Sequence, residues 1–398
     1  MTPHSWRSDW CESLEAALRA VAQWWLTHVV DRDRGRLTGQ VAACGRADPE
    51  APLNLVYVAR LLWFFSELSR RSGVSAHRAA AELCHTVLQR AFHDPRHGGL
   101  FWQVTADGRP RERKKQTYGL AFAVYALAAY QQVSESDAVR SEASALARLI
   151  EDRLFDDRHG GFFEAADRAW RPLADPRLGP TDLAADKTLN THLHLLEAWT
   201  GLVRIDATAA PRLRELLQLY LDRFLAGPDG VAVGFYTRDW RPLTAGHSPG
   251  HAIEASWLLC EAADVLQDAR LQETARSAAL HIAGDVLATA VDDDGGVVAE
   301  FQDGRISDRR RVWWVQAEAM VGFFNAWQLG GDERFLRASR AVWAFIRAHH
   351  VDPRHGEWRW YSARDPDAPA AYLAGPWKAP YHNGRALLEM LRRLSAQR

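Results

Sequence analysis

The segment DPRHGGLFW, from Asp94 to Trp102, joins a turn to a short apolar run, and six segments of this kind occur along the chain. Asp, Pro and Gly are residues that tight turns select, because each favours a turn conformation for its own reason. The six segments begin at residues 31, 94, 156, 228, 292 and 352, so successive copies lie 60 to 72 residues apart. That spacing predicts six repeated units, each with room for two helices of about 17 residues and their connections.

Apolar residues recur at helical spacing throughout the six units. It predicts helices at residues 9–30, 51–71, 76–92, 116–133, 137–154, 187–204, 209–225, 250–267, 271–289, 312–329, 333–350 and 380–396. In each unit one helix runs into the Asp/Gly turn and another leaves the loop that follows it. The helices after the turns are the more apolar, as AFAVYALAAY at residues 121–130 illustrates. Because a helix that is apolar on most sides is buried, we expect these helices to lie inside.

Helical hairpins that cannot bury their apolar faces alone must pack against one another. Six of them close most economically into a double ring. We therefore predict an all-α fold, an (α/α)6 barrel of twelve helices with short strands or loops at one end, formed by residues 1–398 as a single domain. An open α-solenoid is the alternative, but solenoid units usually run about 34 to 47 residues. The longer connections here favour loops that shape the mouth of a pocket.

Composition indicates which kinds of partner the protein binds and in which cellular compartment it lies. The net charge of −1 at pH 7 offers no basic excess for nucleic acid or an anionic membrane, and no stretch approaches the apolar length of a membrane span. The N-terminus carries no apolar core of a secretory signal. The four cysteines are scattered without a CxxC spacing, so we expect them to be reduced and buried. We predict a cytoplasmic protein that is a monomer or a weak homodimer.

Two histidines follow a proline by two residues at the start of a predicted inner helix. In GHSPGHAIEASW, residues 246–257, Ser248 can cap the helix, Pro249 suits its first turn, and His251 follows. Near the C-terminus, Pro380 precedes His382 at the same offset. The N–H groups and dipole of a helix N-terminus disfavour imidazolium, so a histidine placed there is available as a neutral base.

Other polar residues collect in the N-terminal halves of the predicted inner helices. Asn190 and His194 share one helical face, Glu197 follows His194 by three residues, and Glu254 shares a face with His251. Any one of them could be an ordinary hydrogen-bonded core residue. Core packing nevertheless has little use for several ionisable groups, which favours a functional site. The candidate set also contains Arg60, Tyr118, Trp313, Trp314, Gln316 and Glu318.

Two bases on opposite sides of a substrate carbon suit proton removal from one face and return to the other, which is epimerisation. A three-histidine zinc site is an alternative, but among the histidines of the predicted inner helices only His192 and His194 are close in sequence, and their rings diverge. The chain has no Gly-rich phosphate loop, and its scattered carboxylates do not by themselves specify a glycosidase pair. We expect neither a metal nor a cofactor.

The chain resembles the N-acylglucosamine 2-epimerase superfamily and, within it, the cellobiose 2-epimerases. The resemblance runs from about residue 20 to 390, so it covers nearly the whole chain. Motifs of this length and order are more specific than a short pattern. They are VARLLWFFS (58–66), KKQTYGLAFAVYALAAY (114–130), DKTLNTHLHLLEAWT (186–200), GHSPGHAIEASWLLCEAA (246–263), VWWVQAEAMVGFFNAWQ (312–328) and GPWKAPYHNGRALLE (375–389).

The resemblance implies an (α/α)6 barrel and a role for each matching residue. His251 and His382 would be the two acid/base residues at C2 of the sugar, and His194 would assist ring opening and polarise O1. Arg60 would stabilise the enediolate, and Glu254 would orient the substrate or a histidine. The implied substrate-binding residues are Asn190, Tyr118, Trp313, Trp314, Trp377 and Glu318.

The implied reaction is cofactor-independent inversion at C2 of a reducing-end aldose through a cis-enediolate, either cellobiose to glucosyl-mannose or glucose to mannose. The loops at 171–185 and 237–249 would meet a second sugar ring, and they leave the choice between disaccharide and monosaccharide open. Protonation at C1 would give the ketose, so an isomerase of the mannose/fructose type is the nearest alternative. A glycosidase and a catalytically silent sugar-binding barrel are further alternatives on this fold.

Overall fold

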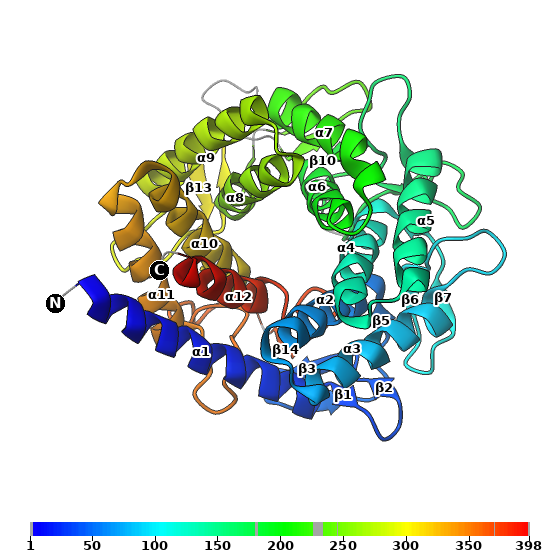
Figure 1. The fold of residues 1–398 in the computed structure, drawn as a ribbon, viewed down its shortest axis with the longest axis horizontal. Coiled ribbons are helices and arrows are strands. Elements are labelled where there is room, and N and C mark those ends of the chain that lie inside the picture. The colour runs from blue at the N-terminus through cyan, green and yellow to red at the C-terminus, as the bar shows by residue number, and fades with distance from the viewer. Residues whose placement is uncertain (1–2, 180–181, 226–233, 245, 370, 397–398) are drawn as a thin grey trace.

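The computed structural model describes residues 3–179, 182–225, 234–244, 246–369 and 371–396. Within these ranges twelve α-helices form two concentric rings (Figure 1), so the predicted (α/α)6 barrel is confirmed. The inner ring consists of α2 (Leu55–Ser72), α4 (Thr117–Ser134), α6 (Leu189–Val203), α8 (Pro249–Leu266), α10 (Trp313–Gly330) and α12 (His382–Ser395). The outer ring consists of α1 (Pro3–His28), α3 (Ser75–Val87), α5 (Asp137–Leu154), α7 (Ala210–Leu219), α9 (Ala269–Thr289) and α11 (Glu333–His349).

Burial separates the two rings as the apolar patterns predicted. In α4 every residue from Thr117 to Val124 is buried, because outer helices and inner neighbours cover it on most sides. The outer helix α5 buries only residues at helical spacing, among them Val139, Ala143 and Ile150. The apolar inner helices therefore form the core, and the outer helices shield them with one face.

Helix ends differ from the predicted ones where local hydrogen bonds decide them. Helix α2 begins at Leu55 because Leu53 and Asn54 form a strand, and the Asn54 side chain caps the helix by accepting a hydrogen bond from the Val56 amide at 3.1 Å. Helices α3 and α7 each pass into a single π-turn, at Leu88–Phe92 and Tyr220–Phe224. Helix α1 starts at Pro3, six residues before the predicted start.

Short antiparallel strands decorate the connections, as expected. Strand β14 pairs with β3, so the last loop of the chain is joined to the first and the ring is closed there. The strands are β1 (Val30–Asp31), β2 (Arg36–Leu37), β3 (Gln40–Ala42), β4 (Ala47–Asp48), β5 (Leu53–Asn54), β6 (Gln103–Val104), β7 (Pro110–Glu112), β8 (Lys115–Gln116), β9 (Ala165–Ala166), β10 (Lys187–Thr188), β11 (Phe235–Tyr236), β12 (Glu300–Gln302), β13 (Arg305–Asp308) and β14 (Tyr372–Ala374).

Two of the repeated Asp/Gly turns tie their unit to the next. The carboxylate of Asp94 accepts a hydrogen bond from Lys115 at 3.1 Å, just before α4, and from Arg168 at 2.8 Å in the following loop. Asp156 is held in the same way by Lys187 at 2.9 Å and Arg238 at 2.8 Å. The turn aspartates thus fix the positions at which the inner helices begin. In the fourth copy, residues 228–233 lie outside the described residues.

The second glycine of the turn makes room for a tryptophan of the next unit. Gly161 has a φ of +76°, which favours glycine, and a Cβ there would lie 2.6 Å from the Trp240 ring. The Trp240 indole N–H donates to the His159 carbonyl at 2.8 Å. The turn motif therefore reverses the chain and also packs against the next unit. His159 has a structural place in this turn and needs no catalytic role.

Replacement of Lys187 by Met should destabilise the fold. The buried Lys187 ammonium donates to Asp156 at 2.9 Å and to the carbonyls of Gly160 and Arg238 at 2.6 and 2.7 Å. Loss of this partner leaves Asp156 partly uncompensated, so the free energy of unfolding in urea should fall by about 3 kcal/mol. The matched control is Arg171→Met, which removes an exposed ion pair to Asp167 and should cost less than about 1 kcal/mol. If both variants lose the same free energy of unfolding, the proposed role of Lys187 in joining the two units through Asp156 is wrong.

The expectation that all four cysteines are buried is wrong for two of them. Cys84 and Cys260 are buried as expected, whereas Cys44 is exposed because it lies in the turn between β3 and β4, and Cys11 is half-buried. Among the described residues, no helix combines the length and the apolar character that crossing a bilayer requires.

Candidate active site

The N-terminal ends of the inner helices surround a cavity of about 300 Å³, which we call the site cavity. Of the candidate site residues singled out from the sequence, all except Glu197, Gln316 and Glu318 line it. The lining residues are Arg60, Tyr118, Leu178, Gly179, Asp182, Asn190, His194, His251, Glu254, Trp313, Trp314, Trp360, Trp377 and His382. Because ring closure directs these helix ends toward one place, residues spread over more than 300 positions of sequence share one wall.

His382 is the first residue of α12 and is paired with a glutamate. Its Nδ1 lies 2.7 Å from Glu318 Oε1. A carboxylate in this position accepts the Nδ1 proton and leaves the Nε2 lone pair available. Burial, reinforced by Arg60 and Arg385, holds the pKa of His382 well below its ordinary value. His382 is therefore neutral near pH 7 and can accept a proton.

His251, the third residue of α8, faces the same cavity. Burial lowers the pKa of His251 to about 3, so it too is neutral near pH 7. The Trp314 ring contacts both histidines, with ring centres 4.7 Å from His251 and 5.5 Å from His382. Two neutral bases are thereby held beside one aromatic surface.

The two histidines are not presented in the same way, which corrects the sequence interpretation. Ser248 occupies the N-cap position of α8, but its hydroxyl donates to the Ala299 carbonyl at 3.3 Å and does not cap the helix. Pro249 is in the first turn of α8, whereas Pro380 precedes α12 and Tyr381 is its N-cap residue. The main cause of the lowered histidine pKa values is burial and not the helix terminus.

His194 forms a second histidine–glutamate pair on α6. Its Nδ1 lies 2.9 Å from Glu197 Oε2, as the spacing of three residues suggested, and its ring packs against Phe122 and Tyr118. Burial opposes ionisation of Glu197, but Arg385 and His194 outweigh it and lower the pKa of this carboxyl to about 2. Glu197 is therefore an anion that orients His194.

Glu254 and Asn190 have side-chain oxygens available for a ligand. Burial and the neighbouring Glu318 raise the pKa of Glu254 to about 7, despite the opposing effect of Arg385. Glu254 Oε2 and Asn190 Oδ1 are buried and have no hydrogen-bond partner among the described residues. Both residues line the site cavity, where the hydroxyl groups of a sugar would satisfy them.

Arg60 is a buried cation with a fixed orientation. Its guanidinium donates to the Tyr118 hydroxyl at 2.9 Å and to the Trp377 carbonyl at 3.4 Å. The same group lies 4.4 Å from the centre of the Phe122 ring and 4.7 Å from that of Tyr381. An anion that forms in the cavity would therefore meet a positive charge that needs little rearrangement.

One group of side chains has the composition of a metal site, but a guanidinium already occupies it. Ligand atoms of Glu254, Glu318 and His382 lie within 4.8 Å of one another. Arg385 donates to Glu254 and, at 2.8 Å, to Glu318, so these carboxylates already have a cation. The residues of this cluster do not fit a metal ion.

Glu318 does not line the site cavity but pairs with His382. Tyr381 and Arg385 contact the same group of buried side chains. Tyr381 and Arg385 were not predicted as site residues, although both stand in the motif GPWKAPYHNGR, one residue before and three residues after His382. Asp182 and Trp360 also line the cavity without having been predicted. The spacing of His382 and Arg385 is that of neighbours on one helical face, which is the signal that was available.

A second cavity of about 270 Å³, the outer cavity, adjoins the site cavity. The two cavities share Leu178, Asp182, Asn190 and His251 as lining residues. The loops at 171–185 and 237–249, predicted to meet a second sugar ring, contribute much of the remaining wall. Their residues there are Pro176, Arg177, Leu183, Ala185, Thr244, Gly246, His247 and Ser248.

Known proteins resemble this chain in sequence and in fold. A cellobiose 2-epimerase from Bacteroides fragilis is 36% identical over 385 residues, covering 93% of this chain and 95% of that protein. The structure of cellobiose 2-epimerase from Spirochaeta thermophila superposes with a TM-score of 0.91 at 36% identity, covering 100% of this chain and 99% of the other. A D-mannose isomerase from Thermobifida fusca is 26% identical over 310 residues, 73% of each chain. The family model described as N-acylglucosamine 2-epimerase matches residues 38–386. The chain therefore belongs to the N-acylglucosamine 2-epimerase family of enzymes, as its motifs predicted.

Proposed function

We propose that the protein is a cofactor-independent sugar 2-epimerase that inverts C2 of the reducing-end glucose of cellobiose or a similar β-1,4 disaccharide. The observation that carries the proposal is the pair His251 and His382, both neutral near pH 7, both in contact with Trp314, in one cavity. Two opposed bases allow one to remove the C2 proton and the other to return it on the opposite face. The similarity to cellobiose 2-epimerases supports the same reaction.

The steps follow from the chemistry of an aldose. The pyranose first opens with assistance from His194, and the C1 aldehyde that forms makes the C2 hydrogen acidic. One histidine removes this proton through Nε2, and the electron pair moves to O1 to give a cis-enediolate. Arg60 offsets the charge on O1, and His194 adds to this only when it is protonated at Nε2 as well as at Nδ1. The second histidine takes a proton from solvent at Nε2 and, after rotation about C2–C3 or from its own side, delivers it to C2. The first histidine releases the abstracted proton to solvent, and the ring closes with inverted configuration.

The outer cavity supports a disaccharide substrate. The site cavity and the outer cavity are of similar volume, about 300 and 270 Å³, and they share a wall. The reacting ring would occupy the first and the second glucose unit would occupy the other. Contacts to the non-reacting ring supply binding energy that can be used at the reacting carbon.

Incubation with cellobiose, mannose and glucose in separate reactions tests the proposal. ¹³C NMR should show glucosyl-mannose from cellobiose, and kcat/KM for cellobiose should exceed that for mannose because the outer cavity contributes only to the disaccharide. A ketose product would favour the isomerase alternative, which the similarity to the Thermobifida fusca D-mannose isomerase makes relevant. Free glucose would identify a glycosidase, and unchanged sugars would contradict catalysis.

A further inference from the structure

One buried guanidinium joins three carboxylates behind the site cavity. Arg385, on α12, donates through Nη1 to Glu197 and through Nη2 to Glu254 and Glu318, the last at 2.8 Å. Its guanidinium is fixed between aromatic rings, 4.7 Å from the ring centre of Trp257 and 4.3 Å from that of Tyr381. These contacts make Arg385 the common partner of glutamates from α6, α8 and α10.

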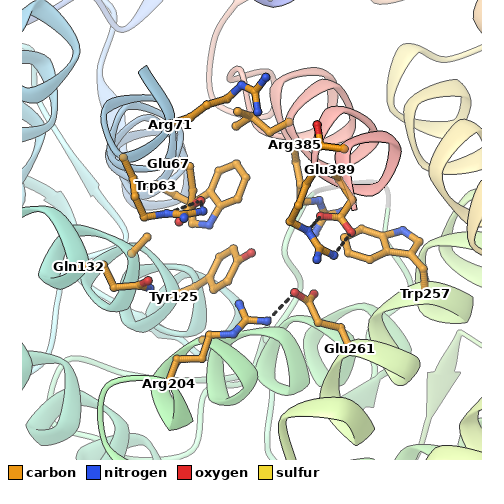
Figure 2. A pocket seen from close by; sticks show the side chains of 16 residues that line it. Trp63, Glu67, Arg71, Tyr125, Gln132, Arg204, Trp257, Glu261, Arg385 and Glu389 are labelled. Carbon is orange, nitrogen blue, oxygen red and sulfur yellow. Dashed lines mark hydrogen bonds and ion pairs between the residues drawn. The ribbon is translucent and has the colours of Figure 1, made fainter. Parts of the chain in front are cut away.

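Arg385 does not line the site cavity. It lines a cavity of about 640 Å³ at the opposite end of the barrel, the lower cavity, where the C-terminal halves of the inner helices meet. Figure 2 shows Arg385 in the wall of the lower cavity together with Trp257 and the ion pair of Arg204 with Glu261. Arg385 therefore lies outside the site cavity, and the three glutamates are its hydrogen-bonded carboxylate connection to the site.

Two of the three glutamates connect Arg385 to a histidine of the site. Glu197 accepts hydrogen bonds from Arg385 and lies 2.9 Å from His194 Nδ1. Glu318 accepts from Arg385 and lies 2.7 Å from His382 Nδ1. An ionised carboxylate can only accept, so a histidine paired with one must carry its proton on Nδ1. A protonated carboxyl could donate instead, which would move the histidine proton to Nε2 and remove the lone pair that faces the sugar.

Charge decides between these two arrangements. Three carboxylates in one buried region repel one another, and a buried carboxylate without a cation takes up a proton. With Arg385 present, Glu197 is ionised near neutral pH, while Glu254, which pairs with neither histidine, has a pKa raised by burial to about 7. Burial also raises the pKa of Glu318, and the charge and hydrogen bond of Arg385 oppose this rise. Removal of Arg385 would leave the three carboxylates without their shared cation and favour protonation of Glu197 and Glu318.

We infer that Arg385 is a positioning residue that keeps Glu197 and Glu318 as hydrogen-bond acceptors and thereby holds both His194 and His382 in the Nδ1–H tautomer. The kinetic consequence of this inference rests on the proposed epimerase function. The tautomer itself can be measured without any reaction, so the two can fail separately.

The direct test is NMR of protein labelled with ¹⁵N histidine, with resonances assigned through His194→Asn and His382→Asn. Long-range ¹H–¹⁵N spectra at pH 7 should show the Nδ1–H tautomer for both histidines in the wild type. Arg385→Gln should move both toward Nε2–H. The matched control, Arg204→Gln, removes the ion pair to Glu261 in the lower cavity and should change neither.

Arg385→Lys covers the case in which Arg385→Gln does not fold. Lysine keeps the positive charge but lacks the planar fork that reaches three carboxylates, so at least one histidine should show a mixture of tautomers. A folded Arg385→Lys variant with both tautomers unchanged overturns the inference.

Kinetics separate a positioning role from a purely structural one. In Arg385→Lys, kcat should fall roughly tenfold with KM changed less than about twofold, because the bases and not the sugar contacts are affected. The acid limb of the rate profile should move to higher pH, since less well compensated carboxylates protonate at higher pH. A purely structural residue would lower the yield or the Tm and leave the pH profile in place. If the wild type epimerises no sugar but the tautomers still depend on Arg385, the proposed function fails and the positioning role stands.

Discussion

Replacement of His251 or His382 by Asn should abolish net epimerisation and leave exchange of the C2 hydrogen in only one epimer. Each histidine, as a neutral base, serves one face of the substrate carbon, and the other, once it has taken a proton from solvent, supplies the proton that completes inversion. His382 is buried and His251 half-buried, both are neutral near pH 7, and each retains its own contact with Trp314 when the other is changed. The remaining histidine can therefore still remove and return a proton on its own side.

The measurement is loss of the C2–H signal in D₂O, followed by NMR from each epimer separately. The two single variants should show opposite preferences, and the double variant should exchange neither epimer. His355→Asn, which changes a histidine of a turn outside the cavity, should exchange both epimers like the wild type. If each single variant exchanges both epimers, or if His382→Asn epimerises at nearly the wild-type rate, the assignment of opposed bases is wrong. His194 would then be the first candidate for the missing base.

Replacement of Arg60 by Ala should lower kcat by roughly 100-fold or more. The guanidinium is buried, bonded to Tyr118 and close to the Phe122 and Tyr381 rings, so it faces the cavity as a preorganised charge. In the proposed reaction the negative charge on O1 appears only when the C2 proton leaves. An interaction with that charge lowers the barrier and contributes little to binding of the sugar.

Steady-state kinetics with cellobiose provide the measurement, and Tyr118→Phe is the matched control. This control removes the hydroxyl that accepts from Arg60 at 2.9 Å but keeps the cation, so its effect on kcat should be much smaller. An increase of KM alone in Arg60→Ala would reassign the residue to ground-state binding.

The barrel was predictable because its determinants are local. The turn that begins at Asp94 and its copies at Asp156 and Asp352 depend on a few adjacent residues, and the apolar periodicity of the helices acts within one or two turns. Six units of similar length then leave ring closure as the economical arrangement. Closure also explains why the predicted residues meet, because it directs the N-terminal ends of the inner helices, which carry Arg60 and His251 among others, toward one cavity.

Which residues pair across long separations in sequence could be learned only from the tertiary structure. His382 pairs with Glu318, and Arg385 reaches Glu197 and Glu254, across separations of 64 to 188 residues. No local pattern specifies which side chains meet across the ring.

The sequence by itself determined the six-unit helical barrel, the family and most of the residues that line the cavity, since these follow from turn chemistry, periodicity and motif. Only the tertiary structure decided why His251 and His382 are neutral. The sequence suggested the helix terminus, whereas the main cause is burial within the closed ring. The hydroxyl of Ser248 likewise bonds to Ala299 of a distant loop in place of its own helix. Desolvation and hydrogen-bond choice are set by everything that surrounds a group, and those surroundings exist only once the ring has closed.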